Sequence, residues 1–171
     1  MYSKIKLMGH PVHPMLVSFP IAFYTATLAA FIAYAVMDDP FWFHLAYTAN
    51  AAGVLMAVVA AVPGFLDWML GVPRGTEARK HGFQHMLLNV TVLVLFSLNL
   101  WLNSGQWNTA QPETTLSITL PAIGFLLTLV AGYLGWTMVQ THHAGVQFSP
   151  SEERCIREVS MREVKEERRA A

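Results

Sequence analysis

The residues of this chain best suited to chemistry are its histidines, and six of the seven stand at the edges of apolar runs. They form three pairs along the chain: His10 and His13, His81 and His85, and His142 and His143. Imidazole exchanges protons near neutral pH and is the commonest metal ligand in proteins. The first pair stands in "GHPVHPMLVSFP", where an apolar run begins. These pairs predict a site for a metal, a haem or a proton if folding brings them together.

Asp67 is the acidic residue expected beside these histidines. It follows a stripe of small residues that recurs at the spacing of one helix face: Ala49, Gly53, Ala57, Ala60 and Gly64. Small residues mark the faces on which membrane helices approach each other closely. The continuation of the stripe reaches Asp67, so we expect its carboxylate to point into the protein. Pro63 is expected to bend the helix one turn before it.

Four long uncharged runs must position these side chains. Only 13% of the 171 residues are charged, and the mean hydropathy is +0.39. No charge occurs in four gaps, which are Lys6 to Asp38, Asp39 to Asp67, Lys80 to Glu113, and Glu113 to Glu152. Each gap exceeds the ~20 residues needed to cross a bilayer. We therefore expect an all-α membrane four-helix bundle over residues 1–148, with helices near 14–36, 43–66, 82–103 and 117–141, and a charged tail over 149–171.

The basic residues predict the orientation of these helices. All eleven fall on one side of a four-helix topology. The charged residues of the opposite loops are all acidic, namely Asp38, Asp39 and Glu113. Because basic residues mark the cytoplasmic face, both termini should be cytoplasmic in a bacterial inner membrane. The six paired histidines then share the cytoplasmic end, and His44 alone lies outside. The single Cys155 falls in the tail, where its thiol should stay reduced.

Helical spacing assigns one inward polar group to each helix. The four are His13, Asp67, His85 and His142, which we take as the candidate ligands; His10, His81 and His143 are expected to act as second ligands or outer-shell partners. Ionisable groups that converge inside a membrane are candidates for a functional site. A structural polar knot that locks the helices together is the alternative.

Several segments resemble a known family of bacterial membrane proteins. They are "GHPVHPMLVSFPIAF", "GFLDW", "PRGTEARKHGFQHMLLN" and "GYLGWTMVQTHHAGV". The chain resembles the family called domain of unknown function 2231 from His10 to Val146. This resemblance implies a four-helix inner-membrane protein and highlights His13, Asp67, His85 and a histidine at 142 or 143. Some relatives appear joined to Rieske iron–sulfur domains, which implies redox chemistry, although this chain lacks such a cysteine–histidine cluster.

Three functions remain open at this point, and the sequence does not decide whether the chain is an enzyme. The first is a redox protein in which His85, with His13 or His142, binds haem b, and Gly64, Gly132 and Gly135 clear space for it. The second is a zinc, iron or copper site made by three imidazoles and a carboxylate. The third is a non-catalytic membrane subunit or an ion path, to which Asn89, Ser97, Asn99 and Asn103 would contribute. The expected partners are the lipid bilayer and a redox protein, and nothing indicates nucleic-acid binding.

Overall fold

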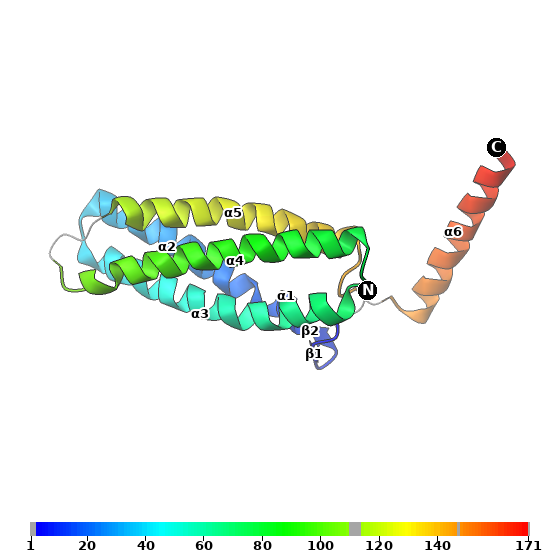
Figure 1. Cartoon of the computed structure of the whole chain (residues 1–171), viewed down its shortest axis with the longest axis horizontal. Helices are drawn as coiled ribbons and strands as arrows, with labels where there is room; N and C mark the ends of the chain where they lie inside the picture. The colour runs from blue at the N-terminus through cyan, green and yellow to red at the C-terminus, as the bar shows by residue number, and fades with distance from the viewer. Residues whose placement is uncertain (1–2, 110–113, 147, 171) are drawn as a thin grey trace.

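The computed structural model, which describes residues 3–109, 114–146 and 148–170, is an all-α bundle of four long helices (Figure 1). These are α2 (Ser18–Met37), α3 (Pro40–Gly71), α4 (Glu77–Asn103) and α5 (Thr115–Gln140). In the described residues four segments are long and apolar enough to cross a membrane: Val12–Met37, Pro40–Gly71, Glu77–Gln106 and Thr115–Gln140. The predicted all-α membrane bundle is confirmed.

Two of these helices extend beyond the apolar runs that predicted them. Helix α3 begins at Pro40, where the Asp39 carboxylate accepts a bond from the Phe41 amide at 2.9 Å. Helix α4 begins at Glu77 because the Thr76 hydroxyl accepts a bond from the Arg79 amide. A side-chain oxygen satisfies an amide that has no partner in the first helical turn. The caps therefore set the helix ends, whereas the apolar runs mark only the part inside the bilayer.

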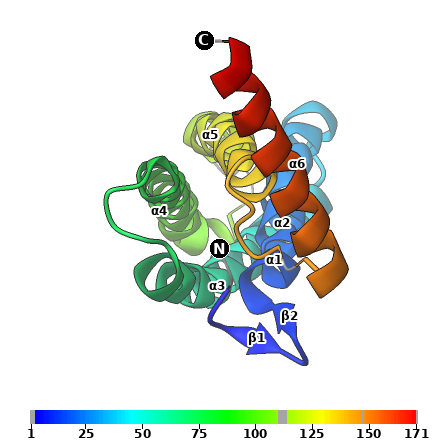
Figure 2. The ribbon, with the colours of Figure 1, turned by 90° about the vertical axis from the view of Figure 1, so that its right-hand side faces the viewer.

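The chain enters the bundle through a small folded segment at the N-terminal end (Figure 2). The two-residue strands β1 (Lys6–Leu7) and β2 (His10–Pro11) form a hairpin, and the short helix α1 (Val12–Leu16) follows it. The helix breaks at Val17 before α2 begins. Pro20 has no N–H to donate to the carbonyl four residues earlier, which accounts for a break in this turn. The predicted first helix thus corresponds to α1 and α2 together, which form the single span Val12–Met37, and His13 lies in α1.

The two halves of the bundle repeat one pattern of residues. Helix α2 packs mainly on α3, and α4 packs mainly on α5. His13 and Tyr24 in the first half correspond to His85 and Phe96, which stand 72 positions later. Gly53 and Gly64 have their counterparts 71 positions later. Further matched positions are buried in both halves: Thr27 and Asn99, Ala46 and Ser117, and Ala60 and Ala131. The bundle is therefore a repeat of two helical hairpins that run in the same direction.

The centre of the bundle shows this repeat in its packing. The rings of Tyr24 and Phe96 stack on each other, with centroids 3.7 Å apart and planes 12° from parallel. Each ring also lies on a glycine of its partner helix. A Cβ atom added to Gly53 would lie 2.8 Å from Cδ1 of Tyr24, and one added to Gly124 would lie 2.6 Å from Cε2 of Phe96. Glycine is required at both positions because a side chain would overlap the ring.

Buried amides join the helices at the end of the bundle away from the termini. Asn50 donates to the side-chain oxygen of Asn99 at 2.8 Å, and Asn99 donates to the Ser117 carbonyl at 3.2 Å. The Ser117 hydroxyl donates to the side-chain oxygen of Asn103 at 2.7 Å. These bonds run between α3, α4 and α5, as expected of polar residues that hold membrane helices together.

The tail forms a separate exposed helix, α6 (Pro150–Ala170), that begins with a capping box. The Glu152 carboxylate accepts a bond from the Ser149 amide at 2.7 Å, and the Ser149 hydroxyl accepts one from the Glu152 amide. Reciprocal bonds of this kind start a helix in water. Hydrogen bonding of the Glu152 carboxyl to the Ser149 side chain, and then to the Ser149 backbone amide, holds its pKa below the ordinary value.

The orientation of the bundle can be tested with the native cysteine. Both ends of the chain and the turn between α3 and α4 lie at the same end of the bundle (Figure 1), and Cys155 is exposed. If this end is cytoplasmic, a membrane-impermeant thiol reagent will leave Cys155 unlabelled in intact cells and label it after lysis. A cysteine placed at Thr109 in a Cys155→Ser background should be labelled in intact cells. The reverse pattern would contradict the predicted orientation.

Candidate functional site

His13 is held against α3 by a bond to a backbone carbonyl. Its Nδ1 atom lies 2.8 Å from the carbonyl oxygen of Ala60. A carbonyl oxygen can only accept, so Nδ1 carries the ring proton and Nε2 is left with a lone pair. Gly64, one turn beyond Ala60, makes room for the ring. A Cβ atom at Gly64 would lie 2.6 Å from Nδ1 of His13.

His85 repeats this arrangement in the second half of the bundle. Its Nδ1 atom lies 2.8 Å from the carbonyl oxygen of Ala131, on α5. Gly135 lies beside the ring, and a Cβ atom there would be 3.2 Å from Cε1. Nδ1 therefore carries the proton in His85 as well. The lone pair of Nε2 accepts a bond from the Asn89 side-chain amide at 3.2 Å, and the same amide nitrogen donates to the His85 carbonyl at 2.8 Å.

The two imidazoles face each other between the halves of the bundle. Their ring centroids are 6.3 Å apart and their planes are 88° apart. Each ring is partly buried, and each is bound to the other helix of its own hairpin. The structure thus brings His13 and His85 together in one protonation pattern. Nε2 of His85 could bind a cation or an iron atom only after the Asn89 amide turns away from it.

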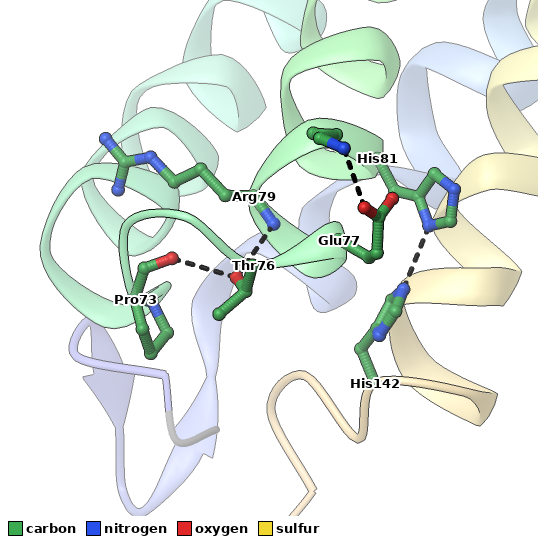
Figure 3. A network of polar contacts seen from close by, with 7 residues as sticks. Pro73, Thr76, Glu77, Arg79, His81 and His142 are labelled. Carbon is green, nitrogen blue, oxygen red and sulfur yellow. Dashed lines mark hydrogen bonds and ion pairs between the residues drawn. The ribbon is translucent and has the colours of Figure 1, made fainter.

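His142 belongs to a second pair, nearer the ends of the helices. Its Nε2 atom lies 2.9 Å from Nδ1 of His81, so one ring donates to the other (Figure 3). The ring centroids are 5.1 Å apart. Figure 3 shows the Glu77 carboxylate beside His81, one turn earlier on α4. His142 was predicted as a member of the inner cluster, but the structure pairs it with His81 instead.

Asp67 does not face the histidines, which differs from the predicted cluster. Its carboxylate accepts bonds from the Ser3 hydroxyl at 2.6 Å and from the amides of Lys4 and Ile5 at 2.7 and 2.9 Å. The stripe of small residues predicted that Asp67 points into the bundle rather than at lipid. However, the N-terminal segment folds over the end of α3 and takes up the carboxylate. Asp67 therefore anchors that segment to the bundle.

The remaining histidines lie apart from both pairs. His10 is exposed and its Nδ1 lies 3.1 Å from the Met8 carbonyl. His143 is exposed beyond the end of α5, with a positive φ of 52°. Its ring contacts Phe148 at a centroid distance of 5.5 Å. The adjacent histidines therefore face different ways, and it is His142 that turns toward the bundle.

The predicted metal site of three imidazoles and a carboxylate does not assemble. Among the described residues, no three His, Cys, Asp or Glu side chains come close enough together to hold one metal ion. Zinc in structural sites takes four protein ligands, and in catalytic sites three. The predicted cluster is thus divided into a pair, His13 with His85, a second pair, His81 with His142, and the anchor Asp67.

Three features of the site were not predicted. They are the carbonyl bonds of Ala60 and Ala131, the bond between His81 and His142, and the contact of Asn89 with His85. The first had a signal, because an alanine followed four residues later by a glycine occurs at the same place in both halves. Backbone carbonyls carry no residue-specific signal of their own. The pairing of His81 with His142 depends on how far α5 extends, which the apolar run does not define.

The anchoring role of Asp67 predicts the effect of a neutral substitute. Asp67→Asn keeps the shape but removes the charge and one acceptor oxygen. Bonds to a charged group contribute about 1.5–3 kcal/mol each, and lost partners are only partly replaced by water. We expect a lower melting temperature and faster proteolysis within residues 3–10, with no change in any ligand bound at His13 and His85. Loss of such a ligand in this variant would contradict the anchoring role and would indicate that Asp67 belongs to the same site as His13 and His85.

Comparison with known proteins agrees with this architecture. A family model described as "Predicted membrane protein (DUF2231)" matches residues 9–148, which include every helix of the bundle. No curated protein and no solved structure matches the chain.

Proposed function

Because the chain belongs to the DUF2231 family of predicted membrane proteins, whose description names no activity, we propose its function from the His13–His85 pair. The proposal is a membrane electron-transfer protein in which His13 and His85, one from each half of the bundle, would hold one haem b. The single observation that carries it is the matched state of the two rings. Both donate Nδ1–H to a backbone carbonyl, and both keep the lone pair on Nε2.

This matched state suits an iron ligand. A ligating histidine almost always donates its second ring N–H to a carbonyl, carboxylate or water, which fixes the ring and makes the ligating nitrogen more basic. Ala60 and Ala131 supply these carbonyls. Gly64 and Gly135 supply the space next to each ring. Gly132 was the other glycine expected to clear space for haem. A Cβ atom at this position would have no other residue within 4 Å, so Gly132 does not position a histidine.

The separation of the rings also favours a shared iron atom. Two imidazoles on opposite sides of one metal, with bonds of ~2.0–2.1 Å, have ring centroids ~6 Å apart. The observed distance is 6.3 Å. Four-helix bundles hold such cofactors between facing helices. Asn89 is an obstacle, because its side-chain amide lies 3.2 Å from Nε2 of His85 and would have to rotate away.

Haem b bound here would supply reversible one-electron transfer. The chain's own residues would then hold and insulate the site. The carbonyls of Ala60 and Ala131 keep the Nδ1 protons in place. The stacked rings of Tyr24 and Phe96 fill the bundle on the side toward its centre, which excludes water there. The His81–His142 pair lies at the other side, at the end where a redox partner could approach.

The visible spectrum of the purified protein tests this proposal. Protein made in cells supplied with haem precursor should show the bands of six-coordinate low-spin haem b, and dithionite should shift them reversibly. Zinc and copper should be present only in traces. Stoichiometric zinc or copper without a haem band would instead support a metal site, and the proposal would be wrong.

A non-catalytic membrane subunit is the second candidate. It is favoured by the fact that both carbonyl bonds join two helices of one hairpin, so they could serve only to fasten the bundle. Interhelical bonds of this kind contribute about 0.6 kcal/mol each. A chromophore-free protein that loses only this much stability when either histidine is replaced would support this candidate.

A further inference from the structure

An open groove of about 390 Å³ lies outside the histidine pairs, where the end of α3 meets the start of α4. It is lined by Trp68, Arg79, Lys80, Phe83 and Gln84. We propose that this groove binds one anionic phospholipid. Its phosphate lies at Arg79 and Lys80, and its acyl chains run along Trp68 and Phe83.

Arg79 is built into the groove with a fixed orientation. Its Nη1 atom donates to the carbonyls of Trp68 at 2.9 Å and Val72 at 2.8 Å. Its guanidinium carbon lies 3.9 Å from the centroid of the Trp68 ring, and the Trp68 indole donates to the Arg79 carbonyl at 3.1 Å. These bonds engage Nη1, whereas Nη2 and Nε carry three further N–H groups. A guanidinium held in this way needs little further ordering to bind a phosphate.

The charge of the surrounding turn favours an anion. Between residues 74 and 80 the chain carries Arg74, Arg79 and Lys80 against the single acid Glu77. The Lys80 ammonium lies 2.7 Å from the Glu77 carboxylate, and both side chains are about two-thirds exposed, at 68% and 66%. Basic pockets between helices at this level of a bilayer bind anionic lipid head groups. The net positive charge selects such a lipid over a neutral lipid or a quinone.

The apolar part of the groove suits acyl chains. Phe83 is 49% exposed and lies one turn into α4 from Arg79. Its ring centroid is 6.2 Å from that of Trp68, which in turn is 6.1 Å from that of Phe65. Trp68 lies near the end of α3, and Phe65 and Phe83 lie farther along their helices into the bundle. Aromatic residues of this kind are typical of the membrane interface. Gln84 is exposed beside them and can donate to an ester oxygen.

Lipid titration of the full-length protein in neutral detergent, read by native mass spectrometry, tests this site. The parent should bind one phosphatidylglycerol more tightly than phosphatidylcholine. Lys80→Gln should weaken phosphatidylglycerol binding about 5-fold, since each basic residue near an anionic lipid contributes about this factor. Glu77→Gln should strengthen it by a similar factor because it removes a negative charge beside Lys80. Lys4→Gln is the matched control, because Lys4 is an exposed cation at the same end but outside the groove.

The opposite signs expected for Lys80→Gln and Glu77→Gln make the result decisive. Equal weakening by Lys80→Gln and Lys4→Gln would mean that the surface attracts anions without a specific site. Equal binding of phosphatidylglycerol and phosphatidylcholine by the parent, or a quinone retained in place of a phospholipid, would contradict the proposal. None of these outcomes depends on whether a haem is bound.

Discussion

Replacement of either His13 or His85 by alanine is expected to remove most of the bound haem, with equal effect. Each histidine belongs to a different half of the bundle, and the two rings occupy equivalent positions in the repeat. Because either substitution would remove one of the two residues proposed to hold the haem, neither histidine could compensate for the other. The haem-to-protein ratio and the low-spin bands should both fall to near zero, while circular dichroism shows that the helices are retained.

The outer histidines provide the control for this experiment. His81→Ala and His142→Ala remove one partner of the pair joined at 2.9 Å, and they leave the carbonyl bonds of His13 and His85 intact. Both variants should keep the parent haem content and the parent absorption maxima. If His142→Ala loses haem as completely as His13→Ala, the pairing that we assign from the structure is wrong. The predicted cluster of His13, His85 and His142 would then be the better description.

Gly64→Ala is expected to have the second-largest effect, although it touches no ligand atom of the proposed site directly. The added methyl group would lie 2.6 Å from Nδ1 of His13, so the ring must leave the Ala60 carbonyl. Loss of a bond that orients a ligand typically weakens cofactor affinity by about 10–100-fold. Overpacking of a close helix contact destabilises by about 1–3 kcal/mol. Haem content after dilution and the melting temperature should therefore fall together.

Substitutions at two other glycines should have smaller effects, in the order of the space around each one. Gly135→Ala should have a smaller effect, since the nearest atom of His85 would lie 3.2 Å away and can shift slightly. Gly132→Ala is the matched control on the same helix, because a Cβ atom there meets nothing within 4 Å. It should change stability by less than about 0.5 kcal/mol and leave haem content unchanged. Equal effects of the three substitutions would contradict the assignment of Gly64 and Gly135 as seats for the histidine rings.

The bundle itself could be predicted because the chain contains four long runs without charged residues. An uncharged run longer than a bilayer crossing has few alternatives to a membrane helix. The first residues of α3 and α4 were harder to predict from the sequence, because each helix start depends on a single capping residue, Asp39 or Thr76. The break between α1 and α2 had a visible cause in Pro20, but a proline near a helix start is compatible with both a break and a continuous helix.

The site could be predicted only in part, and Asp67 shows why. Helical spacing predicted that Asp67 points into the bundle. Its partners are instead the Ser3 hydroxyl and the backbone amides of Lys4 and Ile5, and such amides carry no residue-specific signal. The inner pair His13–His85 was among the predicted ligand pairs because spacing places both on inward faces. Helical spacing shows which face of a helix a residue lies on, but it does not show how deep in the bundle its side chain lies. His142 lies at the depth of His81 rather than that of His85, and it therefore pairs with His81.

The number of haem groups per chain in the purified parent protein tests the central claim most directly. It is obtained by haem extraction and quantitation against the protein concentration from amino-acid analysis. The pair His13–His85 lies between the two equivalent halves, so the bundle has one such position, and we predict one haem b per chain. A value of zero in cells that load other haem proteins, or a value of two, would contradict the account.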